Sequence, residues 1–151
     1  MPTLILLSQI ASTWFLVGLI WTIQVVHYPL FASVGADRFV AYEASHARLI
    51  TLVVGPLMLA EAATAMLLLA IRPASIPMWI PVTGAALLAA IWLTTAFVSV
   101  PCHTRLADGF DAEAHRRLVD TNWIRTIAWS ARAALLLWAG WLTLQAVRAD
   151  A

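Results

Sequence analysis

The sequence predicts an all-α integral membrane protein, folded as an antiparallel four-helix transmembrane bundle. Of its 151 residues, 62% are hydrophobic and 11% are charged, whereas soluble domains carry about 25% charged residues. Four apolar stretches, at about 4–26, 48–71, 78–100 and 123–147, each exceed the roughly 20 residues that cross a bilayer core. Backbone in lipid must satisfy its own hydrogen bonds, so each stretch is expected to form a helix.

The four helices are expected to form one membrane domain, residues 1–151, because they leave no room for a separate soluble domain. The first stretch does not look like a removable signal peptide, since no basic residue precedes it and its apolar part exceeds roughly 15 residues. The connection "IRPASIPMWIP" predicts a tight turn between the second and third helices. In the two longer connections, Asp37 and Asp111 are expected to cap helices that lead into the second and fourth spans.

The basic residues predict an orientation in the membrane. All nine are arginine, and six of them lie in or beside the two longer connections. The positive-inside rule therefore places these loops in the cytoplasm and both termini outside, and we expect a bacterial inner-membrane protein whose main partner is the lipid bilayer. The net charge of +1 gives no indication of a nucleic-acid partner. The sequence is compatible with a homo-oligomer.

Helical periodicity places polar residues on one side of each predicted helix, and in lipid such sides face the bundle interior. Glu61 and Arg132 both fall near the middle of the membrane, where an unpaired charge is costly. We therefore expect a buried Glu61–Arg132 ion pair that fixes the helix register. The alternative is that Glu61 carries protons or forms the base of a pocket. Tyr28 and Tyr42 are expected to be aromatic side chains at the membrane interface.

The histidines predict a metal centre at the cytoplasmic end of the bundle. Glu43 and His46 have the Glu-x-x-His spacing of carboxylate-bridged di-iron bundles, and His27 and His103 lie at the ends of the first and third spans. Only one such motif is present, so one ion is expected, bound by His27, Glu43, His46 and His103. Imidazole with carboxylate suits a transition metal, with iron first and copper or zinc as alternatives. A haem with His27 and His103 as axial ligands is a further alternative.

Three segments carry a resemblance to a known family: "YPLFASVGADRFVAYEASHARLITLVVGPLML", "VPCHTRLADGF" and "NWIRTIAWSAR". In this order they resemble the anthrone oxygenase-like family of small four-helix membrane proteins, over nearly the whole chain. The matching positions are Pro29, Phe39, Pro56, Pro101 to Leu106, and Asn122 to Thr126. The sequence departs from the family at His103, where an asparagine is common, and in carrying His27 and His46.

The resemblance implies an oxidoreductase that acts on a lipophilic aromatic or quinone-like substrate. With the predicted metal, the sequence suggests a metal-dependent oxygenase embedded in the membrane. Asn122 and Arg125 are expected to orient a substrate oxygen or an anionic group, and Glu61 and Arg132 to lie below them.

Three other functions fit the same sequence. A small transporter or binding protein would move protons or solute with the Glu61–Arg132 pair. A haem protein would use the histidines as axial ligands. An accessory subunit would use none of these side chains chemically.

Overall fold

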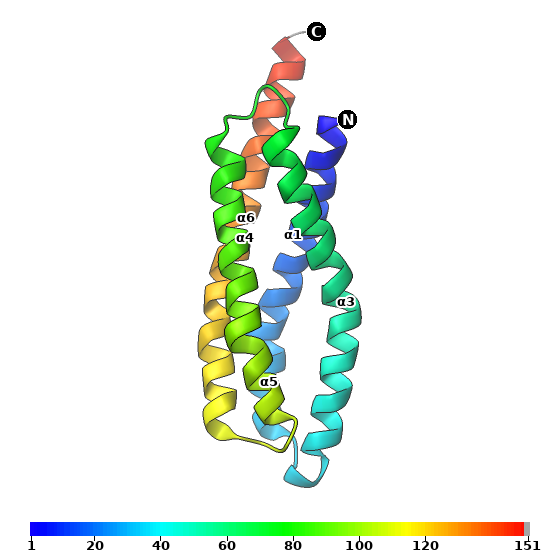
Figure 1. Cartoon of the computed structure of the whole chain (residues 1–151), viewed down its shortest axis with the longest axis vertical. Helices are drawn as coiled ribbons and strands as arrows, with labels where there is room; N and C mark the ends of the chain where they lie inside the picture. The colour runs from blue at the N-terminus through cyan, green and yellow to red at the C-terminus, as the bar shows by residue number, and fades with distance from the viewer. Residues whose placement is uncertain (150–151) are drawn as a thin grey trace.

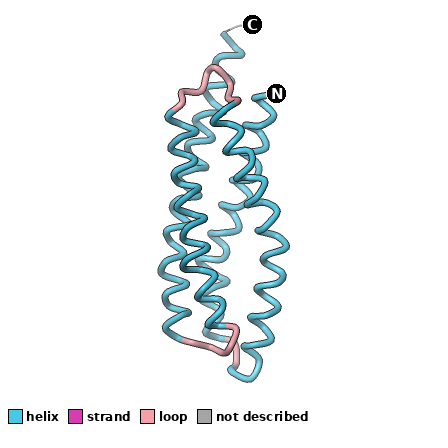
Figure 2. The backbone as a smooth tube through the Cα atoms, in the orientation of Figure 1, coloured by secondary structure: helices cyan, strands magenta, loops and turns pink. Residues whose placement is uncertain are grey.

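The structure, a computed structural model, describes residues 1–149, and this part of the chain consists of helices joined by loops, with no strand (Figure 2). Four long helices lie side by side, and the chain runs along them in alternating directions (Figure 1). Two of them are built from consecutive segments. The first consists of α1 (Pro2–Thr22), the π-helical η1 (Ile23–His27), α2 (Tyr28–Leu30) and the 3₁₀-helical η2 (Phe31–Ser33), and the third of α4 (Trp79–Thr94), the π-helical η3 (Thr95–Ser99) and α5 (Val100–Leu106). The second and fourth are the single helices α3 (Ala36–Ala70) and α6 (Ala112–Ala149).

All four long helices have the length and composition to cross a membrane. They extend over Pro2–Ser33, Ala36–Ala70, Trp79–Leu106 and Ala112–Ala149. Each is longer than the apolar stretch predicted for it, because helix also forms in most of the polar sequence at the end of the bundle opposite the N-terminus (Figure 1). These helices are consistent with an integral membrane protein.

The first and third helices continue through prolines near the predicted ends of their spans. A proline inside a helix removes one backbone hydrogen bond, and its ring clashes with the carbonyl four residues earlier. In both helices a π-helical turn lies just before the proline: η1 ends two residues before Pro29, and η3 ends two residues before Pro101. The wider π turn gives the chain room for the proline ring, so the helix continues.

The two predicted helix caps have different outcomes. Asp111 caps α6 as predicted, because its Oδ1 accepts hydrogen bonds from the backbone amides of Glu113 and Ala114, both at 2.9 Å. The Ala114 amide, with help from Arg105, lowers the pKa of the Asp111 carboxyl. The prediction for Asp37 is wrong. The helix α3 begins at Ala36 after Gly35, so Asp37 lies inside its first turn and makes no capping bond.

The helices pack unequally around the bundle axis. The helix α1 packs closely on α3 and α6, and α4 packs closely on α6, whereas α3 packs only loosely on α4. The core has three apolar layers, with Leu16 and Trp129 in the middle layer and Phe31 and Phe39 in the layer below it. The loose pairing of α3 with α4 leaves space beside the middle layer.

Candidate functional site

The structure brings the four predicted metal ligands together at the end of the bundle where η2 leads into α3. His27 Nε2 lies 2.8 Å from His46 Nδ1, and His103 Nδ1 lies 2.6 Å from Glu43 Oε1. The rings of His46 and His103 have centroids 5.4 Å apart. The side chains come from three of the four long helices.

The contacts within this cluster are hydrogen bonds between the expected ligand atoms. Two nitrogen ligands of one tetrahedral ion lie roughly 3.3 Å apart, because metal–nitrogen bonds measure about 2.0–2.1 Å. The His27–His46 and His103–Glu43 contacts are both shorter than that. The space among the rings is also filled, because the buried Phe31 ring lies against the imidazoles of His27, His46 and His103.

Within residues 1–149, no group of three or more His, Cys, Asp or Glu side chains has an arrangement that could hold a metal ion. Two ligand atoms of the cluster, His46 Nε2 and Glu43 Oε2, are buried and have no hydrogen-bond partner. The four side chains as arranged therefore do not fit the predicted four-ligand centre.

Tyr28 extends the cluster into a directed chain of hydrogen bonds. An ionised carboxylate only accepts, so His103 Nδ1 donates to Glu43, and the neutral ring keeps Nε2 free to accept. The Tyr28 hydroxyl lies 3.1 Å from that Nε2. Arg125 Nη2 donates to the Tyr28 oxygen over 3.3 Å. The chain thus runs from the Arg125 guanidinium through the phenol and the imidazole to Glu43.

The two predicted substrate-orienting residues, Asn122 and Arg125, are in direct contact. Arg125 Nη2 donates to Asn122 Oδ1, and Arg125 Nη1 donates to Thr95 Oγ1 over 3.4 Å. Asn122 Nδ2 donates in turn to Gln24 Oε1 over 2.8 Å. All of Asn122 and most of Arg125 are buried. Side chains from the first, third and fourth long helices therefore fix the guanidinium in place.

A cavity of about 360 Å³ opens beside this chain of hydrogen bonds. Its walls are mostly apolar and come from all four long helices, with Met58, Leu59 and Trp92 among the residues that line it. Leu59 and Trp92 are exposed on the outside of the bundle, so the cavity reaches the outer surface on the side where α3 packs loosely on α4.

The polar end of the cavity carries side chains that the π turns help to place. Its lining includes Tyr28, Thr95, Ser99, His103 and Arg125. Thr95 and Ser99 are the first and last residues of η3, and Tyr28 directly follows η1. The cavity therefore meets the hydrogen-bonded chain at the point where two helices depart from regular α geometry.

His27 and His46 lie on a different side of the cluster. With Tyr42 and Ser45 they line a second cavity, of about 420 Å³, between the first long helix and α3. None of these four side chains lines the cavity that contains Tyr28 and His103. The predicted ligand set is thus divided between two cavities, with Glu43 between them in the bundle interior.

Glu61 and Arg132 form the buried ion pair that the sequence predicts, at 3.2 Å. Glu61 is 0% exposed and Arg132 2% exposed. Both carboxylate oxygens of Glu61 have further partners, because Thr13 Oγ1 donates to Oε1 over 2.7 Å and Trp129 Nε1 donates to Oε2 over 3.0 Å. Arg132 Nη1 also donates to the Gly84 carbonyl. Such complete pairing is typical of a structural ion pair.

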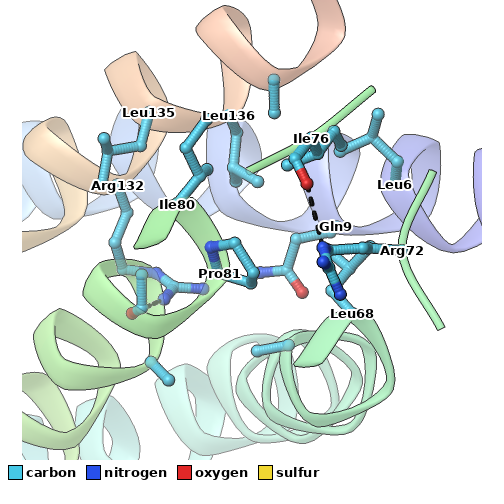
Figure 3. Close-up of a pocket in the computed structure, with 14 residues that line it drawn as sticks. Leu6, Gln9, Leu68, Arg72, Ile76, Ile80, Pro81, Arg132, Leu135 and Leu136 are labelled. Carbon is cyan, nitrogen blue, oxygen red and sulfur yellow. Dashed lines mark hydrogen bonds between the residues drawn. The ribbon is translucent and has the colours of Figure 1, made fainter. Parts of the chain in front are cut away.

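A small space lies beside this ion pair. Figure 3 shows Arg132 on one side of it and Gln9 and Arg72 on the other. Arg72 is held by its own loop, because its Nε donates to the Ile76 carbonyl over 2.9 Å (Figure 3). The volume is only about 30 Å³, the space of about one water molecule. It therefore has no room for a substrate.

No pattern in the sequence indicated a chemical role for Tyr28. Its side chain is 4% exposed and hydrogen-bonded to His103, so the expectation that it lies at the membrane interface is wrong. Counting about 100° per residue does place Thr95, Ser99 and His103 on one side of the third helix. A signal that would have found Tyr28 is a proline two residues from a histidine. This pairing occurs twice, in "HYP" and in "PCH", and each time it lies at the end of a π-helical turn.

Comparison with known protein families, curated proteins and solved structures finds no match for this chain. The resemblance to the anthrone oxygenase-like family therefore stays a prediction from the sequence.

Proposed function

We propose that the chain is an integral membrane protein of a bacterial inner membrane, inserted as an antiparallel four-helix bundle. Support comes from the four apolar helices and from the large apolar side chains exposed on their outer faces, such as Leu52, Phe97 and Ile127. The N-terminus lies at one end of the bundle and the histidine-bearing ends at the other (Figure 1). With the arginine-rich loops in the cytoplasm, the histidines lie at the cytoplasmic end.

The proposed activity is the oxidation of a lipophilic aromatic hydroxyl compound, of the hydroquinone class, that enters from the bilayer. The observation that carries this proposal is the cavity of about 360 Å³, whose apolar walls end on Tyr28, His103 and Arg125. Small-molecule sites usually have volumes of about 300–1,000 Å³, mostly apolar walls and a few convergent polar groups. The opening beside α3 suits a ligand that arrives through lipid.

Tyr28, His103 and Glu43 would remove the proton from the substrate hydroxyl. The substrate passes its proton to the Tyr28 oxygen while the Tyr28 proton moves to His103 Nε2. Glu43 stabilises the imidazolium that forms, as a carboxylate does beside the histidine of a serine hydrolase. The Arg125 guanidinium, fixed beside the Tyr28 oxygen, stabilises negative charge on oxygen in a site with little water.

Loss of the proton prepares the substrate for oxidation, because an aryl oxide gives up an electron more readily than the neutral hydroxyl compound. In the complete reaction two O–H bonds break, and the hydroquinone loses two protons and two electrons to become a quinone. Dioxygen accepts the two protons and the two electrons and leaves as hydrogen peroxide. Dioxygen is apolar and enters apolar cavities readily, and the oxygenase-like resemblance of the sequence supports this acceptor.

A blocked cavity tests the proposal. Leu59→Trp fills the opening, and we expect it to lower the rate of dioxygen consumption with 1,4-naphthohydroquinone roughly tenfold or more, since misplacement of a substrate by about 1 Å can cost a hundredfold. The matched control is Leu52→Trp, two turns away on α3 at an exposed position outside the cavity, which leaves the rate unchanged. Equal rates in the two variants would contradict entry at this site.

The transition-metal centre predicted from the sequence stays a second candidate. The observation in its favour is the pair of free ligand atoms, His46 Nε2 and Glu43 Oε2, both buried without a partner. Elemental analysis of the purified protein tests it: one iron, copper or zinc ion per chain, lost in His46→Ala, supports a metal site. If protein that contains no metal still oxidises the hydroquinone, the metal centre is excluded and the acid–base site is the one remaining candidate.

A further inference from the structure

Arg125 carries a positive charge in the bundle interior that no acidic side chain contacts directly, since Glu43 lies two hydrogen-bonded side chains away. Arg125 is 7% exposed and forms no ion pair with any Asp or Glu in residues 1–149. Its hydrogen bonds go to neutral oxygens of Tyr28, Thr95 and Asn122. The guanidinium is always charged in proteins, and buried charges are nearly always paired. Arg132, the other buried arginine, has its carboxylate partner.

The polar end of the cavity also has two buried atoms without a hydrogen-bond partner. They are Arg125 Nε, which can only donate, and Ser99 Oγ, which can donate or accept. Both residues line the cavity, and Ser99 is 3% exposed. The two atoms come from different long helices. An oxygen-bearing group that reaches these two atoms would find a charged donor from α6 and a hydroxyl donor from η3.

We propose that the ligand of this cavity carries a carboxylate, which pairs with Arg125 and accepts a hydrogen bond from Ser99. A carboxylate places a negative charge in direct contact with the guanidinium. It accepts a charge-assisted hydrogen bond from the free Nε, because the two Nη2 hydrogens already go to Tyr28 and Asn122. The substrate class is then a lipophilic aromatic hydroxy acid. This inference rests on the proposed function, because it concerns a second group on the same substrate.

Two redox-inert probes of the same shape test this inference. The protein in nanodiscs binds 1,4-naphthoquinone, and 2-naphthoate or 2-naphthamide is added to displace it. We expect the carboxylate to displace it at about ten- to a hundredfold lower concentration than the amide, since hydrogen bonds to charged groups contribute that much binding. Arg125→Met removes the preference, and Ser99→Ala reduces it several-fold. Arg116→Met, an exposed arginine of the same helix, leaves it intact.

The outcomes separate this inference from the proposed function. Two results would show that the carboxylate assignment is wrong while the cavity still binds a lipophile. In the first, naphthoquinone binds but naphthoate displaces it no better than naphthamide does. In the second, naphthoate remains the better competitor in Arg125→Met. If neither naphthoquinone nor naphthoate binds, the proposed function fails as well. Arg125→Lys guards against a folding defect in the methionine variant: it keeps the charge and loses the Nε hydrogen bond, so an intermediate preference is expected.

Discussion

Replacing Glu61 with alanine is expected to lower the free energy of unfolding by about 3–5 kcal/mol, the usual result of removing one member of a buried ion pair. The change leaves the Arg132 charge buried without its partner, and it removes the acceptor of the Thr13 and Trp129 hydrogen bonds. The measurement is reversible unfolding in mixed micelles, followed by circular dichroism. Glu113→Ala, at an exposed position of α6, should change the stability by less than about 0.5 kcal/mol.

The double variant Glu61→Leu with Arg132→Met separates the ion pair from the packing around it. Apolar side chains of similar size often replace a buried ion pair without loss, so we expect the double variant to recover most of the stability that Glu61→Ala loses. A double variant as unstable as the single one would mean that the surrounding hydrogen bonds, and not the charge pair, hold these helices together.

Replacing Tyr28 with phenylalanine or His103 with alanine is expected to lower kcat for the hydroquinone by about 10²–10⁴-fold, the range that general acid–base catalysis contributes. The cavity walls are unchanged in Tyr28→Phe, so KM and the affinity for naphthoquinone should change little. Such a loss confined to kcat indicates a role in the chemical step. A loss confined to KM would instead assign Tyr28 to binding alone.

His27→Ala is the control that distinguishes the acid–base mechanism from a metal centre. His27 lines the cavity between the first helix and α3, and its Nε2 contacts His46 rather than Tyr28 or His103. The acid–base mechanism therefore predicts a nearly normal kcat in this variant. A metal bound by all four predicted ligands predicts the same collapse in His27→Ala as in His103→Ala.

Helical periodicity and the depth of both residues in the predicted spans were sufficient to predict the Glu61–Arg132 pair. Both residues lie in regular stretches of α3 and α6, so counting about 100° per residue places them correctly on the inner faces. The sequence also predicted that Asn122 and Arg125 face the same site, and the structure places both in the interior. Where the helix is regular, the positions of polar residues in the sequence are enough to identify the buried ones.

The orientation of Tyr28 could not be predicted in this way. A π turn adds one residue to the helix, which rotates every later side chain by about 100° relative to the count from the preceding α1. Tyr28 follows η1 directly, so its side chain points into the bundle and not toward the interface. The cavity could not be predicted from the sequence either. It depends on the distance between α3 and α4, and composition carries no information about that distance.

Tryptophan fluorescence measures most directly whether a lipophile occupies the cavity beside Tyr28. Trp92 lines this cavity, while Trp79 begins α4 at the other end of the bundle, outside it. In nanodiscs, 1,4-naphthoquinone should quench the fluorescence saturably, and Trp92→Phe should remove much of that quenching while Trp79→Phe leaves it. Quenching that rises linearly with quinone, or that is the same in both variants, would show that the quinone only partitions into lipid and has no site in this protein.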